Sequence, residues 1–122
     1  MNITREQKFI LFALGTCNAE CSKRFADKPI TVTISKGAFI ELAMKSNIVG
    51  KKERALYKNL ELLEKKKLVD YSNKSLHLTN RGQTLYGKVQ KELQPYFAVS
   101  QILNSQDILN FTKKARAVLK NE

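Results

Sequence analysis

The sequence predicts a mainly α-helical fold with one small β-hairpin. Apolar residues recur at helical spacing through most of the chain, and two short runs of alternating apolar and polar residues lie between positions 68 and 78. With 122 residues, of which 43% are hydrophobic and 27% charged, the chain has globular composition and the length of one domain. We therefore expect one hydrophobic core with a few appended elements.

A first helix is expected from Thr4 to about Ala19. Thr4 followed three residues later by Gln7 is typical of a capping box, in which each side chain bonds the other residue's backbone amide. Apolar residues occupy nearly every side of this helix, and Leu11 lies off the main apolar stripe. More than one neighbouring element must therefore cover it.

The next region predicts a strand and a second helix. Residues 20–28 are polar and aperiodic, and over residues 29–34 isoleucine and valine alternate with threonine, as in a short half-buried strand. Ser35 can then cap a helix, which should end in the polar turn at residues 45–47.

A third helix is expected over residues 51–66. Leu56, Leu60 and Leu63 follow one another at spacings of four and three, which places them on one helical face. Two short runs, at 68–71 and 75–78, come next and predict a hairpin with a tight turn at residues 72–74.

A fourth helix should begin near Asn80, with Thr79 or Asn80 as its cap, and Asn80 forms a second cap signal with Gln83. We expect this helix to stop at Pro95, because proline lacks the amide proton that a helix interior needs. Residues 96–119 are predicted to form one broken helix or two consecutive helices, with Ser105 as an internal cap.

The charge distribution favours a polyanionic partner. The formal net charge is +11, and residues 45–82 alone carry ten basic and four acidic side chains. Such an excess raises affinity for nucleic acid without specifying a fold, although a run of charges is also common on an ordinary solvated surface.

Catalytic and metal-binding constellations are not expected. Cys17 and Cys21 make up the whole cysteine content and His77 is the only histidine, which is too little for a disulfide framework or a zinc site. We predict that both cysteines are buried in the core, that the protein is not an enzyme and needs no cofactor, and that it works in the reducing cytoplasm. The longest apolar stretch, residues 9–19, is too short for a membrane anchor.

Two stretches resemble winged helix-turn-helix transcriptional regulators of the MarR type and related small archaeal and bacterial regulators. They are Leu-Tyr-Lys-Asn-Leu-Glu-Leu-Leu-Glu-Lys-Lys-Lys-Leu-Val at 56–69 and Leu-His-Leu-Thr-Asn-Arg-Gly at 76–82. The order helix, strand, helix, turn, helix, hairpin, helix is similar as well. Asn47 and Lys67 stand where such regulators often have glycine; asparagine tolerates a left-handed backbone, whereas lysine tolerates it less well.

The resemblance implies a sequence-specific regulator that binds double-stranded DNA, with the third helix in the major groove and the hairpin as a wing at the backbone. Arg54 and Lys58 would donate to guanine O6 and N7, while lysines at the helix start and on the wing would meet phosphates. The candidate DNA-binding residues are Lys51, Lys52, Arg54, Tyr57, Lys58, Glu61, Asn73 and Lys74.

We divide the chain into a DNA-binding domain at 1–94 and a C-terminal helical extension at 95–122. The C-terminal third carries more apolar surface than a small core accepts, which predicts a homodimer; packing onto the first helix within a monomer is the alternative. The alternative function is a winged-helix module that contacts protein or RNA within a larger complex. No residue identifies a small-molecule effector.

Overall fold

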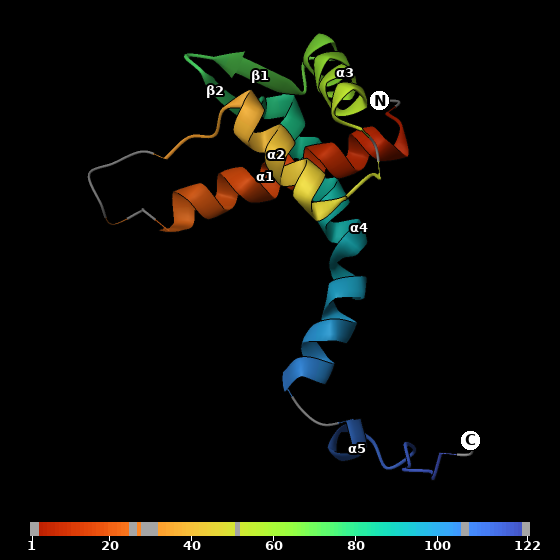
Figure 1. Ribbon diagram of the computed structural model, residues 1–122. Helices are drawn as coiled ribbons and strands as arrows, with labels where there is room; N and C mark the ends of the chain where they lie inside the picture. Colours follow the sequence, from red (N-terminus) through yellow and green to blue (C-terminus); the bar gives the residue numbers. More distant parts are fainter. Residues whose placement is uncertain (1–2, 25–26, 28–31, 51, 106–107, 121–122) are drawn as a thin grey trace. The chain divides into compact units, whose positions relative to one another are not determined.

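The computed structural model describes residues 3–24, 27, 32–50, 52–105 and 108–120 (Figure 1). The chain forms two compact units, Met1–Val89 and Gln90–Glu122. The expected fold class is confirmed at the level of a mainly helical chain with one small antiparallel sheet of two strands. The elements are α1 (Arg5–Arg24), α2 (Lys36–Ser46), α3 (Glu53–Lys65), β1 (Val69–Ser72), β2 (Ser75–Leu78), α4 (Asn80–Ser105) and α5 (Ile108–Phe111).

The core of the first unit lies between α1, α2, α3 and the hairpin (Figure 1). Leu11 is fully buried because α1 contacts α2, α3 and β2. On a further side of α1, the ring of Tyr86 from α4 lies 5.7 Å from that of Phe12. The prediction that several elements cover the first helix is confirmed. The buried apolar residues are Ile10, Leu11, Leu14, Phe39, Ile40, Ala43, Leu56, Leu60, Leu63, Leu68, Val69, Leu76, Leu78 and Val89.

The start of α1 is the expected capping box. The Gln7 amide donates to Thr4 Oγ1 at 3.1 Å, and the Thr4 amide donates to Gln7 Oε1 at 3.2 Å. The end of the helix was predicted wrongly, because α1 continues past Ala19 to Arg24. The added residues are polar, but none of them is a glycine or proline, so the helix has no local reason to stop.

The cysteines of α1 are half-buried rather than fully buried as expected. The core positions of α1 are Ile10, Leu11 and Leu14, and the thiols lie on the later turns of the helix. Burial of the thiol and, to a lesser extent, the neighbouring Cys21 raise the pKa of Cys17 to about 11. The Cys17 thiol is therefore protonated at neutral pH and is a poor nucleophile.

The N-terminus of α2 has the predicted cap, since the Ala38 amide donates to Ser35 Oγ at 3.1 Å. The helix ends at Ser46, and its C-cap is Asn47, whose φ of 53° is left-handed, a conformation that asparagine tolerates. Of the strand predicted over residues 29–34, residues 29–31 lie outside the described residues, and the described residues 32–34 form no strand. One sheet-like bond is nevertheless present, from the Leu76 amide to the Ile34 carbonyl at 2.8 Å.

The C-terminus of α3 is closed by a Schellman motif. The Leu68 amide donates to the Leu63 carbonyl at 3.1 Å and the Lys67 amide to the Glu64 carbonyl at 3.0 Å. Lys67 has a φ of 61°, so a lysine occupies the left-handed position that glycine normally fills. The motif turns the chain directly into β1.

The hairpin is tighter than predicted. Strand residues pair from Val69 with Leu78 to Ser72 with Ser75, which leaves a turn of two residues. These are Asn73 and Lys74, with φ of 51° and 60°, as a type I′ turn requires. The Ser72 predicted for the turn belongs to β1 instead.

The Leu-Thr-Asn-Arg-Gly stretch joins the hairpin to α4. Thr79, rather than Asn80, is the N-cap: its Oγ1 accepts from the Gly82 amide at 3.1 Å and donates to the Lys67 carbonyl at 2.6 Å. Gly82 lies so close to the Leu68 carbonyl that a Cβ atom there would overlap the carbonyl oxygen. Glycine is thus required by helix packing.

The prediction that α4 stops at Pro95 is wrong, because the helix continues to Ser105 with Pro95 inside it. A proline removes one hydrogen bond and crowds the carbonyl four residues earlier, which can distort a helix without ending it. Ser105, expected as an internal cap, ends α4, and its hydroxyl donates to the Ile102 carbonyl at 3.0 Å. Beyond α5, the described residues 112–120 are not helical.

Candidate nucleic-acid interface

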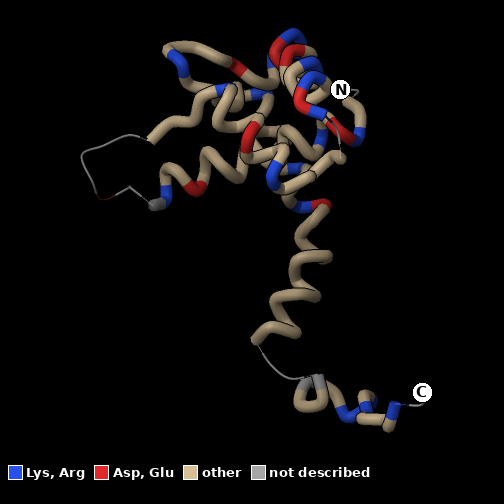
Figure 2. Tube along the Cα trace, viewed as in Figure 1, with Lys and Arg blue, Asp and Glu red and all other residues tan. Residues whose placement is uncertain are grey.

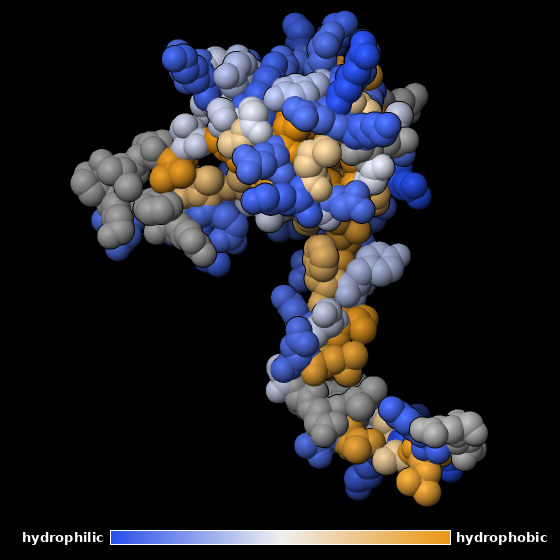
Figure 3. Space-filling view, in the orientation of Figure 1, coloured by the Kyte–Doolittle hydropathy of each residue, from blue (hydrophilic) through white to orange (hydrophobic). Residues whose placement is uncertain are grey.

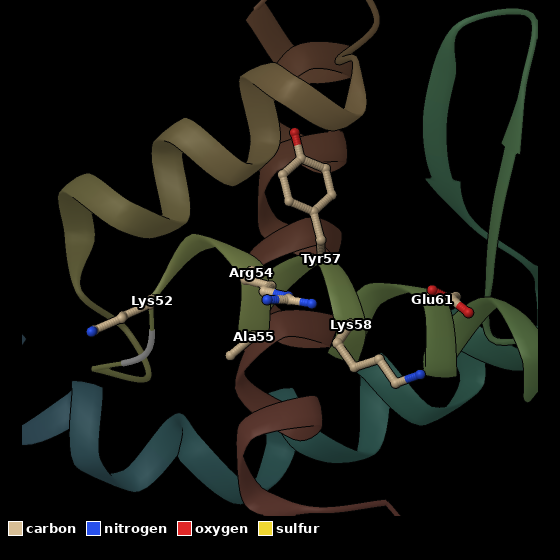
Figure 4. Close-up of a pocket in the computed structure, with 6 residues that line it drawn as sticks. All are labelled: Lys52, Arg54, Ala55, Tyr57, Lys58 and Glu61. Atoms are coloured by element: carbon tan, nitrogen blue, oxygen red, sulfur yellow. The ribbon is translucent and has the colours of Figure 1, made fainter.

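The exposed face of α3 carries most of the predicted site residues. Leu56, Leu60 and Leu63 point into the core, so the side chains on the opposite side of the helix face solvent. A shallow hollow of about 610 Å³ lies on this face (Figure 4). It is lined by Lys52, Arg54, Ala55, Tyr57, Lys58 and Glu61.

The start of α3 is built in a way that lowers helix stability. Lys52 is the N-cap residue and makes no side-chain cap bond, although serine, threonine, aspartate or asparagine would be favoured there. Its positive charge also lies at the positive end of the helix dipole. The cation and the unpaired helical amides together attract an anion such as a phosphate. Local stability is thus reduced at the start of α3.

Two cations in the first half of α3 are not neutralised by any described residue. Among the described residues, Arg54 and Lys58 have no ion-pair partner, and both are exposed. Figure 2 marks several basic positions along the trace of α3, with acidic positions between them. Glu61 is the acidic member of this face, and its Oε1 lies 3.5 Å from Lys65 Nζ one turn later. The face is therefore basic, with one carboxylate within it.

The tip of the hairpin presents a second basic group. Lys74 is exposed and adopts the left-handed backbone that a type I′ turn usually gives to glycine. A bulky residue there is locally unfavourable, as is the lysine at the α3 N-cap. Residues that lower local backbone stability and make no compensating packing contact are expected at functional positions.

Other lysines of the first unit have structural roles. Lys66 Nζ donates to the buried Gln7 side chain at 3.0 Å, which ties the end of α3 to α1. Lys36 Nζ lies 2.7 Å from Glu64 Oε1 and 4.7 Å from the centre of the Tyr71 ring, so it links α2 to α3 and β1. These cations are less available to an external anion than those of the α3 face.

The structure brings together Lys52, Arg54, Tyr57, Lys58 and Glu61 from the predicted set. Lys51 lies outside the described residues, and Asn73 with Lys74 lies at the hairpin tip rather than in the hollow. Of two further members of the α3 surface, Ala55 was not predicted, and Lys65 was expected mainly to favour the helix dipole, with phosphate contact secondary. Ala55 lines the hollow between larger side chains, and Lys65 continues the line of charge four residues after Glu61. The spacing of Lys65 from Glu61 was the available signal.

Comparison with models of known protein families, with curated proteins and with solved structures found no match. The resemblance to winged-helix regulators therefore stays a prediction. Within the described ranges, no three histidine, cysteine or acidic side chains are grouped to hold a metal ion. In the same part of the chain, no helix is both long and apolar enough to cross a membrane.

Proposed function

We propose that this chain is a winged-helix protein that binds double-stranded DNA sequence-specifically and regulates transcription. The observation that carries the proposal is the exposed face of α3, where Arg54, Tyr57 and Lys58 lie together with unneutralised charge. This face belongs to an exposed α-helix and carries several hydrogen-bond donors, and the major groove of DNA admits an α-helix.

The order of elements around α3 supports the proposal. A winged helix places a recognition helix after a helix and a turn, and follows it with a hairpin. Here α2, the turn at Asn47, α3 and the hairpin follow in that order. The hydrogen bond from the Leu76 amide to the Ile34 carbonyl places the segment before α2 beside β2, on the side away from β1.

The charged groups divide into two roles in this proposal. Arg54 and Lys58, on the middle of the exposed face, donate to guanine O6 and N7, and Tyr57 packs beside them against a base or sugar. Lys52, with Lys51 before it, binds phosphate at the start of α3, and Lys74 binds phosphate beside the hairpin, with Asn73 next to it.

The C-terminal unit supplies a surface for a second copy of the chain. From Leu93 to Ser105 α4 has no charged residue (Figure 2), and Figure 3 shows hydrophobic side chains on the surface of this part of the helix. The exposed fractions of Tyr96 and Val99 are 73% and 60%. Two copies that each carry a net charge of +11 repel one another, so self-association needs a charge-free face such as this one. A homodimer would bind two half-sites about 34–36 Å apart.

Binding to duplex DNA is the direct test, measured by fluorescence anisotropy between 50 and 200 mM salt. With about six phosphate contacts, affinity should fall about a thousandfold over this range. In a double variant, Arg54→Ala with Lys58→Ala, affinity for a selected duplex should fall about a hundredfold, with less preference over random DNA.

The matched control for that variant is Lys113→Ala with Lys114→Ala, which removes the same charge from exposed positions of the second unit. Its loss of affinity should be much smaller and equal for selected and random duplexes. No duplex binding at 50 mM salt would refute the proposal, and binding to single-stranded RNA alone would favour the RNA-interaction alternative. Selection of an asymmetric DNA sequence that contains one half-site alone would contradict the homodimer.

Lys74→Gly separates function from stability at the hairpin tip. Glycine relieves the left-handed strain, so the free energy of unfolding should rise by about 0.5–1 kcal/mol. Duplex affinity should nevertheless fall severalfold, equally for all sequences, because a phosphate contact is lost. Urea denaturation and anisotropy measure the two effects on the same sample.

Lys67→Gly is the control, since Lys67 has the same charge and nearly the same φ as Lys74 but follows α3. The free energy of unfolding of Lys67→Gly should rise to a similar extent, and its affinity for duplex DNA should change less than that of Lys74→Gly. Equal losses of affinity in the two variants would contradict the assignment of Lys74 to the DNA backbone.

A further inference from the structure

Glu61 is the one feature of the α3 face that opposes binding to a polyanion. Arg54, Lys58 and Glu61 follow at spacings of four and three, so they form a single ridge on the helix (Figure 4). A carboxylate in this ridge repels the phosphates that the neighbouring cations attract. Its presence on a DNA-binding face therefore needs a cause of its own.

Fold stability does not supply that cause. The other acidic residues of α3 have clear structural positions: Glu53 lies in the first turn, where a carboxylate favours the helix dipole, and Glu64 pairs with Lys36. Among the described residues, Glu61 pairs with Lys65 alone, one turn later, at 3.5 Å, and the side chains are 55% and 67% exposed. An exposed pair of this kind contributes little to stability.

We infer that Glu61 is a specificity-determining residue that accepts a hydrogen bond from the N4 amino group of a cytosine in the major groove. This inference rests on the proposed function. A carboxylate accepts hydrogen bonds only, and cytosine presents only an amino donor at the major-groove edge. The guanine edge presents two acceptors, which suit the donors of Arg54 and Lys58 on the same ridge.

The length of the ridge sets the register of the contacts. Arg54 and Glu61 are seven residues apart, which is about 10 Å along a helix, or about three base pairs of duplex. The bound DNA should therefore hold a cytosine about three base pairs from the guanine that Arg54 contacts. The ridge thus selects a short sequence with guanine at one end and cytosine at the other.

The test is selection from a pool of randomised duplexes by the full chain, followed by sequencing, for the unaltered protein, Arg54→Ala, Glu61→Ala and Glu61→Gln. The position at which Arg54→Ala loses the preference for guanine identifies the base pair that Arg54 contacts. Glu61→Ala should remove the preference for cytosine about three base pairs away, by about tenfold or more, and should raise affinity for random duplex about threefold. Glu61→Gln should shift the preference toward adenine, because glutamine pairs with the adenine edge.

Glu41→Ala is the matched control. Glu41 is also exposed, also pairs with a lysine four residues later, at 3.8 Å, and lies on α2. It should keep the cytosine preference. The inference is overturned if Glu61→Ala selects the same bases as the unaltered protein, or if the unaltered protein selects a base other than cytosine there. Failure of the unaltered protein to bind any duplex at 50 mM salt would instead overturn the proposed function and this inference with it.

Discussion

Gly82→Ala is expected to lower the free energy of unfolding by about 3 kcal/mol, the largest single effect of the changes considered for the first unit. The added Cβ would overlap the Leu68 carbonyl oxygen and would lie 3.3 Å from the Leu78 Cβ. That carbonyl cannot move away easily, because it accepts the Thr79 amide at 3.1 Å. Urea denaturation followed by circular dichroism measures the loss.

Gly87→Ala, in the same helix, is the matched control for Gly82→Ala. A Cβ at Gly87 would meet no atom within 4 Å, so alanine there should raise the free energy of unfolding by about 0.5–1 kcal/mol. The two substitutions are chemically identical and opposite in expected sign. Equal stability of the two variants would show that the start of α4 does not pack on the end of α3 as described.

Local signals in the sequence predicted the fold class and most helix starts. The pairing of Thr4 with Gln7, the Ser35 cap and the leucine spacing of α3 each depend on residues three or four apart, and all are present in the structure. The exposed face of α3 followed from the same reasoning, because burial of one helical face fixes the other. Five of the eight candidate residues thus meet in one hollow.

Helix ends and long-range contacts were less accessible to sequence reasoning. Whether α4 continues through Pro95 depends on whether the helix tolerates the loss of one hydrogen bond, which the sequence does not show. The full length of α1 reflects the absence of a glycine or proline after Ala19, and no residue pattern there marks the end of the helix. The need for Gly82 arises from a carbonyl fourteen residues earlier in the chain. Such contacts leave no local periodicity in the sequence.

The electrostatic detail of the candidate site also required the structure. The sequence shows many lysines in residues 45–82, but it does not tell which are engaged. Lys66 and Lys36 turned out to hold the first unit together through Gln7 and Glu64, whereas Arg54 and Lys58 did not. Basic residues that are alike in sequence therefore differ in their availability to an external anion because of their neighbours in space.

The free edge of β2 gives a second large effect on stability. Asn18 of α1 donates from Nδ2 to the Leu76 carbonyl at 3.3 Å and accepts the Leu78 amide at Oδ1 at 3.4 Å. Both backbone groups point away from β1, so Asn18 takes the place of a neighbouring strand. One side chain thus satisfies a donor and an acceptor that pairing within the hairpin leaves open.

Asn18→Ala is expected to lower the free energy of unfolding by about 2 kcal/mol, because two partly buried backbone groups lose their partner. The exposed Asn104 of α4 is the control: Asn104→Ala brings the same gain in helix propensity and should change stability by less than about 0.5 kcal/mol. Hydrogen exchange gives a local measure, since the Leu78 amide should lose protection in Asn18→Ala well before the amides that bond β1 to β2. Unchanged protection of Leu78 would contradict the role of Asn18, whereas its selective loss would show that α1, and not the hairpin alone, holds the strand beside the α3 face.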